Sequence, residues 1–180
     1  CARSRMFIEH AVYDEFMERF VEATRRLRVG DPMDAATQVG PLVSEDQRKR
    51  AERYIRDAVK AGARLHCGGE RMDGPGFYLT PAVLSGVPVD HPAWCEEIFG
   101  PVVCLRPFEN EATMIGEVNA SPYGLSGSIW TRYLSRALRV ARRVESGVLS
   151  VNTHSSVHLE APFGGFKQSG LGRDLGMAAL

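Results

Sequence analysis

The sequence predicts an α/β fold, with a mainly parallel open sheet and helices on both of its faces. Short apolar segments of strand length alternate along the chain with longer segments whose apolar residues recur at helical spacing. Strands that alternate with helices usually form parallel sheets whose connecting helices cover the faces. At 180 residues, 44% of them hydrophobic, the chain is long enough to bury a core without disulfides or metals.

The first half of the chain should begin with a short strand at residues 5–8 and continue into a helix. Apolar residues recur at helical spacing from Val12 to Leu27, and the turn at Gly30-Asp31-Pro32 ends this helix. The next helix opens with a capping box, in which the Ser44 hydroxyl accepts a backbone amide and Gln47 reaches back. We expect this second helix to stop at Gly62.

The second half should add further strands and one more helix. The strands are expected at residues 81–84, 102–105, 125–130 and 147–152, and the helix at residues 132–144. In parallel α/β sheets, ligands bind beyond the carboxyl ends of the strands. Asn152 and the loop after it are therefore candidates for a binding site.

Charge and cysteine content narrow the class of protein. The 22 Lys and Arg residues balance 22 Asp and Glu residues, so no basic surface for nucleic acid is expected. No apolar run approaches the roughly 20 residues of a membrane helix, and the first residues, Cys-Ala-Arg-Ser-Arg, do not resemble a basic cap before the apolar region of a secretory signal. The four cysteines lack metal-ligand spacing. We expect a cytoplasmic protein with reduced thiols and no metal, bound to neither nucleic acid nor membrane.

The ends of the sequence suggest a piece of a longer polypeptide. The chain begins at Cys1 without Met and stops at Leu180 without a terminating pattern. No repeat or linker interrupts it, so we treat residues 1–180 as a single unit.

The segment at residues 96–101, Glu-Glu-Ile-Phe-Gly-Pro, is the first candidate for a ligand contact. A carboxylate held there could accept hydrogen bonds from ribose hydroxyls, and the Phe99 ring could lie against a flat heterocycle. The alternative is a solvated acidic turn with one buried anchor, which these six residues alone favour.

The glycine-rich stretch near the end of the chain carries no nucleotide-binding fingerprint. Gly170, Gly172 and Gly176 superficially match the dinucleotide pattern, but that pattern needs a strand immediately before it. Here a turn-rich loop precedes it. These glycines are better explained by tight turns and close backbone approach.

Three further groups of residues could have a functional role, but each also has a simpler structural explanation. Arg3 and Arg5 could lower the pKa of the Cys1 thiol, but a lone cysteine is more often inert. His154 and His158 would need a helix to share a metal, and the intervening serines favour a loop. A row of arginines from Arg132 to Arg143 is explained by a solvated helix face, or by an anion or subunit contact.

Five motifs occur together in one fixed order. They are Gly76-Phe-Tyr-Leu-Thr-Pro-Ala-Val83, Glu97-Ile-Phe-Gly-Pro101, Asn119 with Tyr123-Gly-Leu125, Gly147-x-x-x-Val151-Asn152, and Pro162-Phe-Gly-Gly-x-Lys-x-Ser-Gly170. In this order the chain closely resembles the C-terminal catalytic part of the NAD(P)-dependent aldehyde dehydrogenases, from residue 1 to about residue 178.

The resemblance implies an activity and a truncated dehydrogenase catalytic domain. The family oxidises an aldehyde to a carboxylate with NAD or NADP, through a cysteine thiohemiacetal and a thioester that a glutamate-activated water hydrolyses. It implies that residues 1–147 belong to the catalytic domain and that residues 148–180 form the active-site loop and the return towards the cofactor domain. It also implies a small aldehyde substrate and a full-length homodimer or homotetramer.

Site residues carry over by position. Glu97 resembles the residue that holds the nicotinamide ribose, and Phe99 the one that lies against the nicotinamide. Asn152 resembles a position near the active-site thiol. Thr153, Val157 and Phe163 match the region that lines the aldehyde entrance.

The nucleophile falls at the start of the chain. With Ser4-Arg5 as reference, the family's catalytic cysteine lies one position before Cys1, so Cys1 matches its neighbour. An alignment with one gap makes Cys1 itself the catalytic residue. On the first alignment the isolated chain is expected to be inactive, because it also lacks the nucleotide-binding sheet.

Two other functions are compatible with the same residues. One is a noncatalytic assembly module that keeps the fold, because a fold does not fix a function. The other is a cysteine-dependent reductase that acts on acyl phosphates or acyl-CoA.

Overall fold

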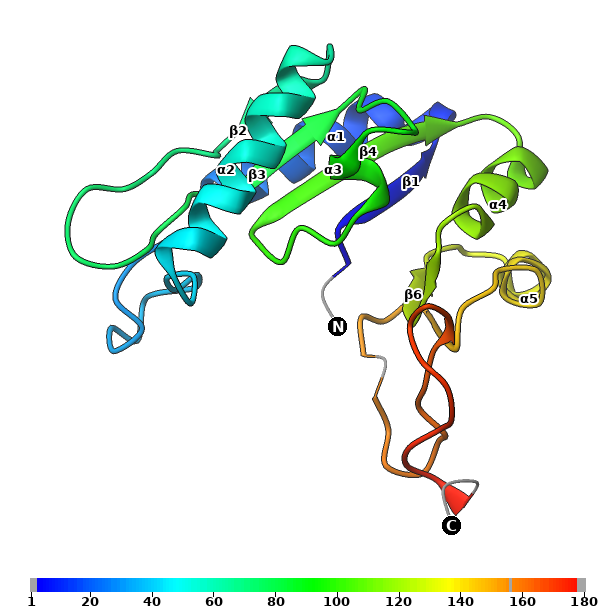
Figure 1. Cartoon of the computed structure of the whole chain (residues 1–180). Helices are drawn as coiled ribbons and strands as arrows, with labels where there is room; N and C mark the ends of the chain where they lie inside the picture. Colours follow the sequence, from blue (N-terminus) through cyan, green and yellow to red (C-terminus); the bar gives the residue numbers. More distant parts are fainter. Residues whose placement is uncertain (1–2, 156, 178–180) are drawn as a thin grey trace. The chain divides into compact units, whose positions relative to one another are not determined.

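The computed structural model describes residues 3–155 and 157–177, which pack into two compact units (Figure 1). We call them the N-terminal unit, which ends at Glu109, and the C-terminal unit, which begins at Asn110. This division follows the packing of the chain. The expected division between residues 147 and 148 concerns function and stays a prediction.

The N-terminal unit is built on a four-stranded sheet in the order β1-β4-β3-β2. Its elements are β1 (Arg5–Glu9), α1 (His10–Arg25), α2 (Glu45–Lys60), β2 (Arg64–Cys67), β3 (Ala82–Ser85), α3 (Pro92–Cys95) and β4 (Val102–Phe108). Strands β1, β4 and β3 are parallel, whereas β2 runs antiparallel to β3. The α/β class is confirmed, but the sheet is mixed. The connection from β2 to β3 contains no helix, so the chain returns alongside itself.

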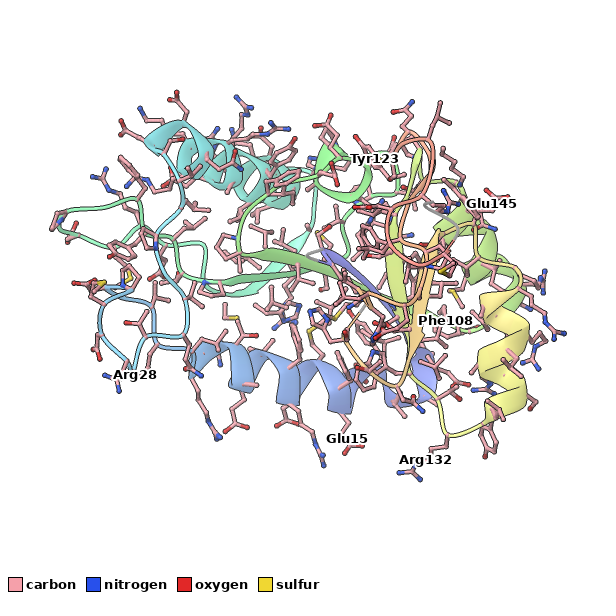
Figure 2. All side chains as sticks on the ribbon, turned by 90° about the horizontal axis from the view of Figure 1, so that it is seen from below. Glu15, Arg28, Phe108, Tyr123, Arg132 and Glu145 are labelled. Atoms are coloured by element: carbon pink, nitrogen blue, oxygen red, sulfur yellow. The ribbon has the colours of Figure 1, made fainter. Side chains whose placement is uncertain are left out.

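Helices cover both faces of this sheet, as the sequence predicts. Side chains of a strand alternate between its faces, and along β3 Leu84 points into one core while Val83 points into the other. Helices α2 and α3 pack on the Leu84 face, and α1 packs on the Val83 face through Met17. Figure 2 shows the sheet between α1, whose Glu15 points outward, and α2.

The C-terminal unit consists of short elements. They are α4 (Glu111–Asn119), β5 (Tyr123–Gly124), β6 (Ser126–Ile129), α5 (Leu134–Ala141), β7 (Val148–Val151) and β8 (Phe166–Lys167). Strands β6 and β7 pair in parallel, and β5 and β8 pair antiparallel. The parallel β6–β7 pair brings the carboxyl ends of these two strands together, which is where the candidate loop after residue 152 begins.

The predicted helices and strands lie close to their expected positions, and five short elements, β2, α3, α4, β5 and β8, were missed. Ser44 caps α2 by accepting a hydrogen bond from the Gln47 backbone amide at 3.2 Å, and Gly62 follows the helix with a positive φ of 97°. Strand β2 was missed because it is an edge strand with exposed residues at its start. Helix α3 is only one turn long, and α4 buries only Ile115.

Leu84 anchors the core between α2 and the sheet, since none of its surface is exposed. We expect Leu84→Ala to lower the free energy of unfolding of the N-terminal unit by about 2–5 kcal/mol, because the deletion leaves a cavity. Urea unfolding followed by the fluorescence of buried Trp94, with exposed Trp130 replaced by Phe, measures this loss. Val43→Ala, at a side chain that is 88% exposed, is the control and should change the free energy by less than about 0.5 kcal/mol. Equal effects of the two substitutions would contradict this core assignment.

Candidate functional site

The turn that carries Glu97 and Phe99 lies between α3 and β4 and is anchored by the residue between them. Ile98 is 1% exposed and belongs to the core between α2 and the sheet. Glu97 is exposed and the Phe99 ring is 73% exposed. The buried anchor that the sequence suggests is therefore present, with the two candidate side chains directed away from the core on either side of it.

One face of α2 holds this turn at three points. The Gln47 side-chain amide donates hydrogen bonds to the carbonyl oxygens of Ile98 and Phe99, both at 2.8 Å. A Cβ atom on Gly100 would lie 3.1 Å from the Ala51 Cβ, so the backbone of the turn approaches the helix closely. These contacts, together with a hydrogen bond from Tyr54 to Glu96, make α2 the support of the turn.

Gln47 is the positioning residue that sequence analysis missed. The capping box explains the hydrogen bond that the Gln47 backbone amide donates to the Ser44 hydroxyl. It predicts that the Gln47 side chain reaches back to the start of the same helix. In the structure the side-chain amide nitrogen instead reaches carbonyl oxygens 51 and 52 residues away in sequence. No local sequence pattern predicts such a contact, because both acceptors are backbone carbonyl oxygens, which every residue has.

The backbone of Phe99 adopts a conformation that a large side chain rarely takes. Its φ is +52°, in the left-handed region. Such a conformation costs free energy and persists only where surrounding contacts hold it. Here the Gln47 hydrogen bonds to the carbonyl oxygens at residues 98 and 99 provide that hold.

The Glu97 carboxylate has unused hydrogen-bonding capacity. It makes no hydrogen bond or ion pair within the part of the N-terminal unit that the structure describes. An ionised carboxylate has two acceptor oxygens and can take both donors of a pair of neighbouring hydroxyl groups. The exposed ring of Phe99 adds an apolar face beside it.

In the C-terminal unit, Asn152 joins the ends of β6 and β7. Its side-chain Oδ1 accepts a hydrogen bond from the Thr131 backbone amide, and its Nδ2 donates to the Thr131 carbonyl, each at 2.9 Å. Its φ is +52°, a value that asparagine tolerates better than most residues. The Asn152 amide is thus engaged with Thr131, and its role in this unit is to fix the start of the loop that follows.

The three residues predicted to line an aldehyde entrance lie along that loop. Thr153 accepts a hydrogen bond from Ser150 on its carbonyl oxygen at 3.1 Å. Val157 is 50% exposed. Phe163 is half-buried, and its backbone pairs with that of Asp174 through hydrogen bonds of 2.6 and 2.7 Å. The start of the loop is therefore held by the side chains of Ser150 and Asn152, and its end by backbone pairing.

A close contact between two glycines and the interactions of one lysine stabilise other parts of the C-terminal unit. A Cβ on Gly147 would lie 1.7 Å from the Gly164 carbonyl oxygen, so only glycine fits there. The Lys167 ammonium donates to the carbonyl oxygens of Asn119 at 2.6 Å and Ser121 at 3.0 Å, and lies 2.8 Å from a Glu145 carboxylate oxygen. Gly170 and Gly172 have positive φ with open space around them, as tight turns require, and a Cβ on Gly176 would lie 2.9 Å from the Pro162 backbone nitrogen, as expected for close backbone approach.

The described thiols do not provide a nucleophile. Burial raises the pKa of the Cys104 thiol to about 12, and it also raises the pKa of Cys67. A raised pKa keeps a thiol protonated and unreactive. The Cys95 thiol donates to the Val89 carbonyl oxygen at 2.9 Å. Cys1 lies outside the described residues.

The remaining candidate groups show no ligand site. Among residues 3–155 and 157–177, no three His, Cys, Asp or Glu side chains come together as metal ligands. The Arg139 guanidinium makes two hydrogen bonds of 2.7 Å to Glu111 on α4, which lowers the pKa of that carboxyl. Two arginines of the row, Arg136 and Arg139, therefore pair with a carboxylate of their own unit. Within the described chain, no helix is long and apolar enough to cross a membrane.

Comparison with known proteins identifies the family. The profile of the Aldehyde dehydrogenase family matches residues 1–180. The chain is 44% identical over 180 residues to betaine aldehyde dehydrogenase from Rhizobium johnstonii, covering 98% of this chain and 37% of that protein. It is 42% identical over 179 residues to retinaldehyde dehydrogenase 3 from Rattus norvegicus, covering 99% and 35%. The chain belongs to the aldehyde dehydrogenase family.

Solved structures agree with this assignment. The NAD+ complex of aldehyde dehydrogenase from Bacillus cereus superposes with a TM-score of 0.94 at 37% identity, covering 98% of this chain and 36% of that one. Betaine aldehyde dehydrogenase from Staphylococcus aureus with NAD+ gives 0.93 at 33% identity, with 98% and 36% coverage. The chain thus spans just over a third of the length of these relatives.

The contact between Gly147 and Gly164 predicts that an added methyl group lowers the stability of this unit at Gly147 but not at a glycine with open space around it. We expect Gly147→Ala to destabilise the C-terminal unit by about 2 kcal/mol or more, because backbone atoms must shift. Gly116→Ala, in α4 with open space around it, is the matched control and should stabilise by about 0.5–1 kcal/mol. Thermal unfolding followed by circular dichroism, with limited proteolysis of residues 152–163, compares the two. Similar behaviour of the two variants would refute the close contact.

Proposed function

We propose that this chain is the C-terminal part of the catalytic domain of an aldehyde dehydrogenase that oxidises an aldehyde to a carboxylate with NAD+ or NADP+. The observation that carries the proposal is the clamped turn at residues 97–99. It presents a free carboxylate beside an exposed aromatic ring, in a chain that belongs to this family. Relatives solved with NAD+ support the choice of cofactor.

The residues of the N-terminal unit suit the nicotinamide end of that cofactor. The Glu97 carboxylate would accept hydrogen bonds from the two ribose hydroxyls, and the exposed Phe99 ring would lie against the nicotinamide. When bound, the cofactor supplies a hydride acceptor. The chain's contribution is orientation, because Gln47 and α2 hold the turn before anything binds.

The residues of the C-terminal unit would line the aldehyde entrance. Asn152 fixes the beginning of the loop through Thr131, and Thr153, Val157 and Phe163 then contribute its wall. His154, Ser155 and His158 on this loop, together with Ser156, which lies outside the described residues, suit a polar or amino-substituted aldehyde. The relatives named for betaine aldehyde and for retinaldehyde differ in the size and charge of the aldehyde they are named after.

The covalent chemistry requires the rest of the dehydrogenase. In the full-length enzyme a cysteine thiolate would attack the carbonyl carbon to give a thiohemiacetal, which would give its hydride to the nicotinamide and leave a thioester for water to hydrolyse. On our alignment Cys1 is the neighbour of that nucleophile. The glutamate base, the oxyanion-hole asparagine and the nucleotide-binding sheet would come from the preceding polypeptide. We place the full-length protein in the cytoplasm as a homodimer or homotetramer.

Glu97→Gln in the full-length dehydrogenase tests the ribose contact. A neutral amide accepts hydrogen bonds more weakly than a carboxylate, so we expect NAD+ affinity or the rate of hydride transfer to fall about tenfold. Steady-state kinetics with NAD+ as the varied substrate, and thermal unfolding to show an intact fold, measure this. Glu109→Gln, at another exposed glutamate of the same unit, is the control. Unchanged affinity and turnover would instead favour the solvated acidic turn.

The isolated 180-residue chain should form no NADH from an aldehyde panel at saturating NAD+. Without the phosphate and adenosine contacts, a turn that carries Glu97 has too few interactions to bind the cofactor tightly. Circular dichroism establishes that the chain is folded, and NADH absorbance follows the reaction. Turnover that Cys1→Ala abolishes would show that Cys1 is the nucleophile. Phosphate- or CoA-dependent turnover of the full-length protein would identify an acyl reductase.

A further inference from the structure

The carboxylate next to Glu97 is tied to α2 by a tyrosine. The Tyr54 hydroxyl donates a hydrogen bond to Oε2 of Glu96, and Tyr54 is only 7% exposed. We propose that the Tyr54–Glu96 pair is a positioning pair that fixes the direction of the Glu97 carboxylate towards the cofactor. This inference rests on the function proposed above and assigns a role to two residues outside the cofactor contact itself.

The contact between Tyr54 and Glu96 also affects the neighbouring residue, Glu97. Glu96 has φ −100° and ψ 167°, an extended conformation. Tyr54 holds the Glu96 side chain against α2, and Ile98 is buried in the core. Glu97 lies between these two anchored residues and is exposed.

The tyrosine is arranged so that its proton is available to Glu96. The Arg50 side chain donates to the Tyr54 hydroxyl oxygen at 3.2 Å, and its guanidinium carbon lies 5.6 Å from the centre of the Tyr54 ring. An oxygen that accepts from Arg50 is free to donate its own proton elsewhere. Burial, together with the Glu96 hydrogen bond, raises the pKa of Tyr54, which keeps the donor protonated.

Tyr54 and Gln47 act on opposite ends of the same turn. They lie seven residues apart on α2, which places them on one face of the helix two turns apart. Gln47 holds the carbonyl oxygens after Glu97, and Tyr54 holds the side chain before it. Removing the Tyr54 contact therefore releases one side of Glu97 while the strained Phe99 backbone stays supported.

A double-mutant cycle in the full-length dehydrogenase tests the pair. We expect Tyr54→Phe and Glu96→Ala each to raise the KM for NAD+ about fivefold, and the double variant to raise it no further, because both remove one contact. The KM for the aldehyde should stay unchanged. Glu96→Gln, which keeps an acceptor for the Tyr54 hydroxyl, should stay within about twofold of the parent. Tyr13→Phe, a tyrosine on α1 in the same unit, is the matched control.

Glu97→Gln in the same enzyme separates failure of this inference from failure of the proposed function. If Glu97→Gln weakens NAD+ binding while Tyr54→Phe and Glu96→Ala do not, the pair has no positioning role and the ribose contact stands. Additive effects in the double variant, or a parallel rise in the aldehyde KM, would also overturn the pair. If Glu97→Gln has no effect, the proposed function fails and the pair's role fails with it. Should Tyr54→Phe fail to fold, the comparison of Glu96→Gln with Glu96→Ala decides.

Discussion

The packing of α2 against the turn at residues 96–100 is the constraint on which the candidate cofactor contact depends. Gln47, Ala51 and Tyr54 share one helix face, and each meets a different part of the turn. The Ser44 cap and the buried Ile55 and Ala58 fix the helix, so the turn is placed by the core of the unit. Glu97, which has no hydrogen bond or ion pair within the described part of this unit, thereby acquires a defined direction.

The two units hold their candidate residues by different means. In the N-terminal unit, the Gln47 side chain on α2 is hydrogen-bonded to the backbone of a turn whose candidate side chains, Glu97 and Phe99, are exposed. In the C-terminal unit, backbone approaches backbone, as at Gly147 and Gly164, and at Phe163 with Asp174. A contact made by a side chain tolerates a conservative substitution of that side chain. A close contact between two backbone segments leaves no room for the Cβ atom that any substitution of glycine would add.

Much of the fold could be predicted from the sequence, because periodicity records which side of an element is buried. The helix after Ser44 and the apolar runs at β3 and β4 were identified in this way. The antiparallel edge strand β2 could not be, since its start is exposed and nothing local fixes its direction. The main sheet is therefore mostly parallel, as expected, with an antiparallel edge strand that was not expected.

The site was predictable only in part, for a physical reason. The buried anchor Ile98 follows from apolar patterning, but the partners of its turn lie about fifty residues away in the sequence, and no local rule pairs them. The position of Asn152 near a thiol stays a prediction, whereas the pairing of its amide with Thr131, set by the parallel register of β6 and β7, was not foreseen. The roles in cofactor and substrate binding come from family resemblance and stay predictions.

The most direct measurement is a crystal structure of the full-length dehydrogenase with NAD+ bound. The account predicts a Glu97 carboxylate oxygen within about 2.5–3.0 Å of a hydroxyl on the nicotinamide ribose. It also predicts Phe99 with positive φ, and Gln47 and Tyr54 still bonded to the turn. A bound cofactor with Glu97 turned to solvent, or with the turn detached from α2, would contradict it.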